Sequence, residues 1–127
     1  MAVFSIDVQI GKASPARLAV VADDDLEQRA AVTRQLEALG FTVAQASDGY
    51  EALSIIGERE PGIALLRRHA ESDDGERAAA LARMLYPRTR IIMTAGPADV
   101  RTDDDAFTVL SLPADARGLD RCLLEAA

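Results

Sequence analysis

Charged side chains follow two of the short apolar runs in this sequence, and their types limit the chemistry that they can do. The run Leu18–Ala22 ends at three consecutive aspartates, 23–25. The run Ile63–Leu66 ends at two arginines, Arg67 and Arg68. A guanidinium stays protonated in proteins and is not a nucleophile, but its planar donors suit carboxylate oxygens. We therefore expect ion pairing rather than covalent chemistry at Arg67.

The elements that position these residues follow from the spacing of apolar side chains. Short apolar runs alternate with helical patterns from Arg17 onward. Strands are predicted over Leu18–Ala22, Phe41–Ala46, Ile63–Leu66, Arg90–Thr94 and Phe107–Leu112. Five successive β-then-α units predict an α/β fold, a five-stranded parallel sheet with right-handed crossovers and helices on both faces. Sites in such open sheets form at the carboxyl ends of the strands.

Five helices are expected between and after these strands. The first follows the aspartates and ends at Gly40, and the second is capped by Ser47-Asp48 and breaks near Gly57. The third uses Ala78, Leu81, Ala82 and Leu85 as its apolar positions. A polar helix over Pro97–Asp105 and an amphipathic helix over Ala116–Ala126 complete the set.

The first residues stand outside this repeating unit. Residues 2–10 alternate in part between apolar and polar side chains, which predicts an extra strand within 1–11. Residues 12–16, Lys-Ala-Ser-Pro-Ala, are typical of a linker. The main domain is therefore expected over residues 17–127.

Composition excludes several classes of function. The 127 residues suit one domain, and the net charge of −7 with a pI near 4.6 argues against nucleic-acid binding and against polybasic membrane contact. One cysteine and one histidine are too few for a disulfide or a zinc site. The sequence has neither a run of about 18 apolar residues nor a signal-peptide start. We expect a cytoplasmic domain.

Several blocks in this order give the sequence a resemblance to the receiver domain of two-component response regulators. The resemblance covers residues 17 to 126. It rests on Leu18-Ala-Val-Val-Ala-Asp-Asp-Asp, Arg29, the block from Leu36 to Leu53, Pro61 to Leu66, Asp74-Gly75, Ile91-Ile-Met-Thr-Ala95 and Leu112-Pro113. It implies the flavodoxin-like (βα)5 receiver fold.

The resemblance also assigns expected roles to single residues. Asp23 and Asp24 match the acidic pair that helps to hold Mg²⁺, and carboxylates are the hard ligands that this ion takes. Thr94 matches the hydroxyl that senses the phosphoryl group. The sequence departs from the family at Arg67, which replaces the phosphoacceptor aspartate, and at Leu112, which replaces a lysine. A third departure, Val109, stands in place of the usual switch aromatic.

These departures predict a degenerate, non-catalytic pseudo-receiver. Our hypothesis is that Arg67 pairs with Asp23 or Asp24 and replaces both metal and phosphate, so that neither Mg²⁺ nor another cofactor is expected. The alternative is that Arg67 turns to solvent at the strand end. A third hypothesis keeps a phosphoacceptor at a non-standard site, Asp73 or Asp74, although a solvated turn beside Gly75 explains these acids equally.

The leading segment suggests a parent protein and a partner. Residues 2–11 resemble the final strand of the ATP-binding domain of histidine kinases, whereas an ordinary edge strand is the alternative. The resemblance implies a fragment of a hybrid histidine kinase that docks on catalytic or dimerisation domains in the same parent chain. The family's usual docking face would here include Val100, Phe107, Val109, Leu110 and Leu119.

A second hypothesis is a ligand sensor. Arginines bind phosphates and stack on bases, so a group of them could hold a cyclic dinucleotide such as cyclic di-GMP. The group consists of Arg83, Arg88, Arg90 and Arg101, around the fourth expected strand. The alternative is that these arginines are solvated side chains on an acidic surface.

Overall fold

The computed structural model describes residues 17–99 and 106–125. The predicted extra strand and linker, together with Val100 and Arg101, lie outside the described residues. Most of the polar helix that was expected over 97–105 lies outside them as well, and its described part is a short 3₁₀ helix, η2 (Pro97–Asp99).

Five parallel strands form one sheet, as predicted. They are β1 (Leu18–Ala22), β2 (Thr42–Ala46), β3 (Ile63–Arg67), β4 (Arg90–Ala95) and β5 (Thr108–Ser111), in the order β2-β1-β3-β4-β5. The first four residues of β3 are fully buried, as expected of a central strand covered on both faces. The carboxyl ends of β1 and β3 therefore lie side by side at one edge.

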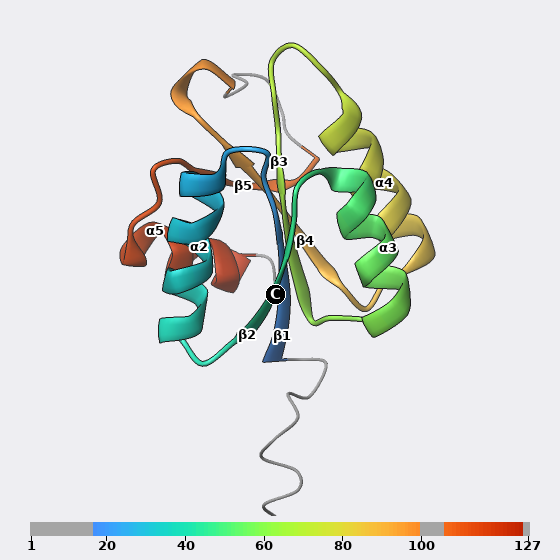
Figure 1. Ribbon diagram of the computed structural model, residues 1–127, viewed down its shortest axis with the longest axis horizontal. Helices are drawn as coiled ribbons and strands as arrows, with labels where there is room; N and C mark the ends of the chain where they lie inside the picture. The colour runs from blue at the N-terminus through green and yellow to red at the C-terminus, as the bar shows by residue number, and fades with distance from the viewer. Residues whose placement is uncertain (1–16, 100–105, 126–127) are drawn as a thin grey trace, which may run out of the picture.

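Among the described residues, four α-helices cover the sheet, and helices lie on both of its faces (Figure 1). Helices α2 (Leu26–Ala38) and α5 (Ala116–Glu125) cover one face, and α3 (Gly49–Arg59) and α4 (Asp74–Leu85) cover the other. Successive β-strand residues point to opposite faces, so Leu65 joins one apolar core and Leu66 the other. In the described parts of the chain, no helix has the length and apolar character needed to cross a bilayer.

Side-chain caps define where the first two helices begin. Asp25 accepts hydrogen bonds from the backbone N–H groups of Glu27 and Gln28, and Asp48 accepts one from Glu51. The predicted break near Gly57 is wrong, because α3 continues to Arg59. Gly57 leaves room for the Tyr86 phenol, since a Cβ there would lie 2.6 Å from the hydroxyl oxygen.

The buried face of α4 differs from the prediction. Ala78 and Ala82 are buried as expected, but Leu81 and Leu85 are exposed. Small residues bring α3 and α4 so close together that a Cβ at Gly49 would lie 2.9 Å from the Ala78 Cβ. The leucines of α4 are therefore left on its outer side.

Candidate functional site

Asp23 and Arg67 meet at the carboxyl ends of neighbouring strands. Ala22 and Leu66 are partners in the β1–β3 register, so the residues that follow them emerge side by side. Arg67 Nη1 lies 3.1 Å from Asp23 Oδ2, and the exposed fractions of the two side chains are 15% and 3%. The pairing expected from the sequence is confirmed for Asp23, and the alternative of a solvent-facing Arg67 is wrong.

Asp99 is a second carboxylate partner of Arg67, which the sequence analysis missed. Arg67 Nη2 lies 3.3 Å from Asp99 Oδ2, while Asp99 Oδ1 accepts a 2.8 Å hydrogen bond from the Ala70 backbone N–H. Gly96 leaves room for this contact, because a Cβ there would lie 3.3 Å from Arg67 Nη2. Arg67 thus connects the ends of β1 and β3 with the loop that follows β4.

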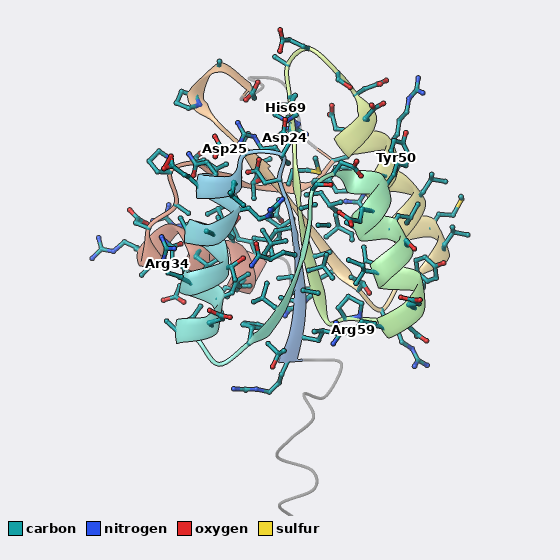
Figure 2. All side chains as sticks on the ribbon, viewed as in Figure 1. Asp24, Asp25, Arg34, Tyr50, Arg59 and His69 are labelled. Carbon is teal, nitrogen blue, oxygen red and sulfur yellow. The ribbon has the colours of Figure 1, made fainter. Side chains whose placement is uncertain are left out.

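Asp24 pairs with a different residue. Its Oδ1 lies 2.8 Å from Nε2 of His69, two residues beyond the end of β3. Figure 2 shows both side chains at the carboxyl edge of the sheet, where Asp24 is largely exposed and His69 is partly buried. The sequence analysis did not connect His69 with this edge, because loop geometry rather than strand register brings it there.

The carboxyl groups of the site have different proton affinities. Burial raises the pKa of Asp23 above its usual value, despite a backbone hydrogen bond and the charge of Arg67, which both lower it. Burial also acts to raise the pKa of Asp24, but the hydrogen bond and charge of His69 outweigh it, and the net pKa is lowered. The Ala70 N–H, followed by Arg67, lowers the pKa of Asp99.

The guanidinium of Arg67 keeps its charge in this setting. Partial burial acts to lower its pKa, but Asp23 and then Asp99 outweigh that effect and raise it. The site therefore holds a permanent cation beside a buried carboxylate.

Thr94 and Leu112 are positioned by the sheet rather than by Arg67. Thr94 is buried and is the register partner of Arg67, and its carbonyl accepts a 2.7 Å hydrogen bond from the Arg68 N–H. Leu112 is buried in the apolar core between the sheet and helices α2 and α5. It therefore brings no polar group to the acidic edge, where the family's lysine would lie.

The residues present do not fit a magnesium ion. In residues 17–99 and 106–125, no three His, Cys, Asp or Glu side chains are arranged to hold a metal. Asp23 already faces the Arg67 cation, and a divalent ion at the same carboxylate would meet a like charge. The Arg67 side chain lines the same cavity, of about 140 Å³, as Asp23 and Asp24, so its charge lies where such an ion would bind.

Asp73 and Asp74 lie at the beginning of α4. Asp73 is exposed and pairs with Arg77, 3.2 Å away on the next turn of the helix. Asp74 is in the first turn of the helix and lines the small cavity beside Arg67. A phosphoacceptor at either acid stays a prediction.

The arginines that were predicted to form one group are divided between the two faces of the sheet. Arg83 lies over the Phe107 ring, 3.9 Å from its centroid, on the face covered by α4. Arg90 donates instead to the Leu123 carbonyl of α5, on the other face. Arg88 and Arg90 line a shallow groove of about 620 Å³ at the amino ends of β3 and β4. The prediction of a single cluster is therefore wrong for Arg83, which lies on α4 on one face of the sheet, whereas Arg90 reaches α5 on the other face.

Two of the predicted docking residues are core residues. Leu110 and Leu119 are buried between the sheet and helices α2 and α5, so they cannot contact a partner. Phe107 and Val109 are half-buried and pack against the core on the opposite face. Apolar character alone did not separate core from surface in this region.

Comparison with known proteins identifies the fold. No family model and no curated protein sequence matches the chain. Among solved structures, chemotaxis protein CheY4 from Vibrio cholerae matches with a TM-score of 0.73 and 21% identity, over 88% of this chain and 99% of that one. The chain has the fold of a receiver domain.

Two further solved structures agree with this assignment. The receiver domain of NtrX from Brucella abortus has a TM-score of 0.73 and 23% identity, over 85% of this chain and 96% of that one. A CheY-like response regulator receiver domain protein from Methanospirillum hungatei has a TM-score of 0.68 and 18% identity, over 86% and 93%. At these identities the likeness establishes the receiver fold and leaves the chemistry to the residues of the site.

Proposed function

We propose that the chain is a pseudo-receiver that regulates a histidine kinase of a two-component system by protein–protein docking and is not itself phosphorylated. The observation that supports this most is the ion pair of Arg67 with Asp23, 3.1 Å long, at the carboxyl edge of β1 and β3. It puts a fixed cation at the strand end where a phosphorylated receiver needs a carboxylate.

The chemistry of the site supports the loss of phosphorylation. An acyl phosphate forms on a carboxylate nucleophile, and the Arg67 guanidinium, whose pKa is raised further by its partners, cannot attack a phosphorus atom. The Leu112 side chain has no amine to bind phosphoryl oxygens, and it lies in the apolar core. Asp23, the remaining buried carboxylate, already has Arg67 as its counter-charge.

The contacts of Arg67 also support a static role. This one side chain joins Asp23 at the end of β1 to Asp99 in the loop after β4, and Asp99 in turn holds the Ala70 N–H after β3. A switching receiver makes and breaks its contacts here with the phosphoryl group. In this chain the permanent cation of Arg67 makes these contacts. We therefore infer that the domain regulates its partner by binding to it and not by a change in phosphorylation.

The kinase partner is inferred from the sequence. Residues 2–11 resemble the last strand of a histidine kinase ATP-binding domain, which would put the chain directly after such a domain in a hybrid kinase. Docking would then take place on the dimerisation or catalytic domains of the same parent, and the chain itself would have no enzymatic activity.

A phosphorylation assay tests the loss of the receiver reaction. The chain is incubated with acetyl phosphate and Mg²⁺ and its intact mass is measured, with an ordinary receiver domain as the positive control. We expect no added phosphoryl group on the wild type. An adduct that survives acid and is lost in alkali would contradict the proposal, and peptide mapping would decide between Asp73 and Asp74.

A kinase assay tests the docking itself. The dimerisation and catalytic domains of the parent kinase are expressed separately, and their autophosphorylation rate is measured with increasing amounts of this chain. A saturable change in rate is expected, and it should persist without any phosphodonor for the chain. An unchanged rate, together with no binding by calorimetry, would contradict docking.

The alternative function is sensing of cyclic di-GMP. The groove at the amino ends of β3 and β4 favours it, because Arg59, Arg88 and Arg90 all line that groove. Two glutamates, Glu58 and Glu60, line it too and would repel an anionic ligand. An amide-resolved NMR titration with cyclic di-GMP decides: localised, saturable shifts around Arg88 and Arg90 would establish the sensor, and their absence there would leave docking.

A further inference from the structure

The outer side of α4 carries an apolar surface that the fold does not use. Leu81, Met84 and Leu85 have exposed fractions of 37%, 70% and 54%, and Ala80 is exposed beside them. The spacing of three and four residues puts Leu81, Met84 and Leu85 on one side of the helix. We call these four residues the α4 ridge. Leu26 and Leu124 are also exposed, but each stands on a different helix.

The way in which α4 packs explains why the ridge is exposed. Its buried side consists of Ala78, Ala79 and Ala82 only, and these small side chains bring it close to α3. The far end of the contact is fixed by Tyr86, whose hydroxyl faces Gly57 of α3. Helix α4 therefore packs against its neighbour α3 (Figure 1) through its small residues, and its large apolar side chains are left exposed.

The charge around the ridge differs in sign from that of the whole chain. The net charge of the protein is −7, yet the segment 77–90 contains four arginines and no acidic residue. Arg77, at the amino-terminal end of the ridge, is exposed and forms an exposed i,i+4 pair with Asp73. Arg88, just beyond the carboxyl-terminal end, is exposed and lines a groove together with Glu58 and Glu60. Arg83 is exposed as well and faces Phe107. An apolar strip between exposed cations is complementary to an apolar strip between anions.

We propose that the α4 ridge is a docking site for an amphipathic helix that carries acidic residues beside its apolar stripe. The apolar side chains of such a helix would cover Leu81, Met84 and Leu85, while its carboxylates would face Arg77 and Arg88. The ridge occupies the carboxyl-terminal half of α4, where Arg83 contacts Phe107 directly before β5, whereas Arg67 ends β3 and pairs with Asp23 and Asp99. The interaction is therefore independent of the Arg67 pair and of the proposed regulation of a kinase.

Two synthetic peptides of matched length test this proposal on the intact chain. Both are amphipathic helices with the same leucine stripe, one flanked by glutamates and the other by lysines. Binding is measured by fluorescence anisotropy at low and at high salt. We expect the glutamate peptide to bind, the lysine peptide to bind at least about tenfold more weakly, and the difference to shrink as salt screens the charges.

Neutral substitutions locate the site. Met84→Gln together with Leu85→Gln should weaken binding of the glutamate peptide by about tenfold or more. A few side chains carry most of the binding free energy of such an interface, and these two are the most exposed apolar side chains of the ridge. Leu124→Gln removes an even more exposed leucine from α5, with 77% of the residue accessible, and should leave binding unchanged. Circular dichroism and thermal melting verify that each variant is folded.

Three results would overturn the proposal. Equal binding of the two peptides would show that the arginines do not select the partner. Unchanged binding by the Met84→Gln/Leu85→Gln variant would show that the ridge is not the binding site. Sedimentation showing a wild-type dimer that the same double variant dissociates would instead assign the ridge to a second copy of this chain. Arg67→Met should bind the glutamate peptide as the wild type does, which keeps this test separate from that of the pseudo-receiver proposal.

Discussion

Nη1 of Arg67 lies 3.1 Å from Oδ2 of Asp23, and the pair stands at the edge of the sheet where two central parallel strands end. Asp23 directly follows β1 and Arg67 is the last residue of β3, so their separation is fixed by the register of the two strands rather than by flexible loops. A cation is therefore built into the carboxyl end of the sheet, beside a buried carboxylate.

Removal of the Arg67 charge should destabilise the fold. Arg67→Met keeps much of the side-chain length but leaves the buried Asp23 carboxylate without its cation, and we expect a loss of about 1–3 kcal/mol in the free energy of unfolding. Urea denaturation at neutral pH measures it. Arg77→Met is the matched control, because its exposed pair with Asp73 should contribute no more than about 0.5 kcal/mol. Equal losses in the two variants would refute a special role for Arg67.

Asp99 should hold the loop after β3 in place. Its Oδ1 accepts the Ala70 N–H, so Asp99→Ala would leave that amide without its carboxylate acceptor. We expect hydrogen exchange at Ala70 to become faster, with amides in the core of β3 unchanged. If exchange at Ala70 stays at the wild-type rate, the bridge from Arg67 through Asp99 does not order this loop.

The three aspartates of the site should titrate in a fixed order. The pKa of Asp23 is raised above 3.8, and the pKa values of Asp24 and Asp99 are lowered below it, so Asp23 should take up its proton first as pH falls. Carboxyl ¹³C shifts followed by NMR from neutral to acidic pH measure the order directly. Asp24 or Asp99 protonating before Asp23 would contradict the described contacts.

The same shifts give opposite contributions to stability. Asp23 binds its proton more tightly in the folded state, so its contribution to the free energy of unfolding increases as pH falls through its raised pKa towards 3.8. The contribution of Asp24 is present above 3.8 and is lost as pH falls through its lowered pKa. In Asp23→Asn the first effect should disappear, which denaturation curves at several pH values between neutral and 3.8 would reveal.

Gly75 should be intolerant of any side chain. A Cβ at this position would collide with the carbonyl oxygen of Arg67, which is backbone and cannot turn away. We expect Gly75→Ala to cost about 1–3 kcal/mol in the free energy of unfolding, as overpacking does elsewhere. Gly118→Ala on α5 is the control, because its Cβ would meet mainly the movable Asp115 carboxylate, and alanine favours helix by up to about 1 kcal/mol.

The sequence predicted the sheet and the central ion pair for the same physical reason. Continuous apolar runs mark buried parallel strands, and a charged residue directly after such a run must emerge at the sheet edge, which is how Asp23 and Arg67 could be brought together. Asp99 and His69 were missed because they lie in loops, where the positions of side chains depend on turn geometry that no periodicity reports.

The exposed leucines of α4 illustrate a second limit. Spacing of three and four residues predicted that Leu81 and Leu85 face the core, yet the helix turns its alanines inward. Close approach to α3 through Gly49 and Ala78 gives tighter packing than the leucines would allow. Periodicity finds the sides of a helix, but the shape of the neighbouring helix decides which side is buried.

Binding of Mg²⁺ tests most directly whether Arg67 has replaced the metal. Amide shifts of the wild type and of Arg67→Asp, which puts a carboxylate back at the end of β3, are followed in an NMR titration with Mg²⁺. We predict no saturable shift at Asp23 and Asp24 in the wild type and saturable shifts at both in the variant. Saturable shifts of equal affinity in the wild type would contradict the account.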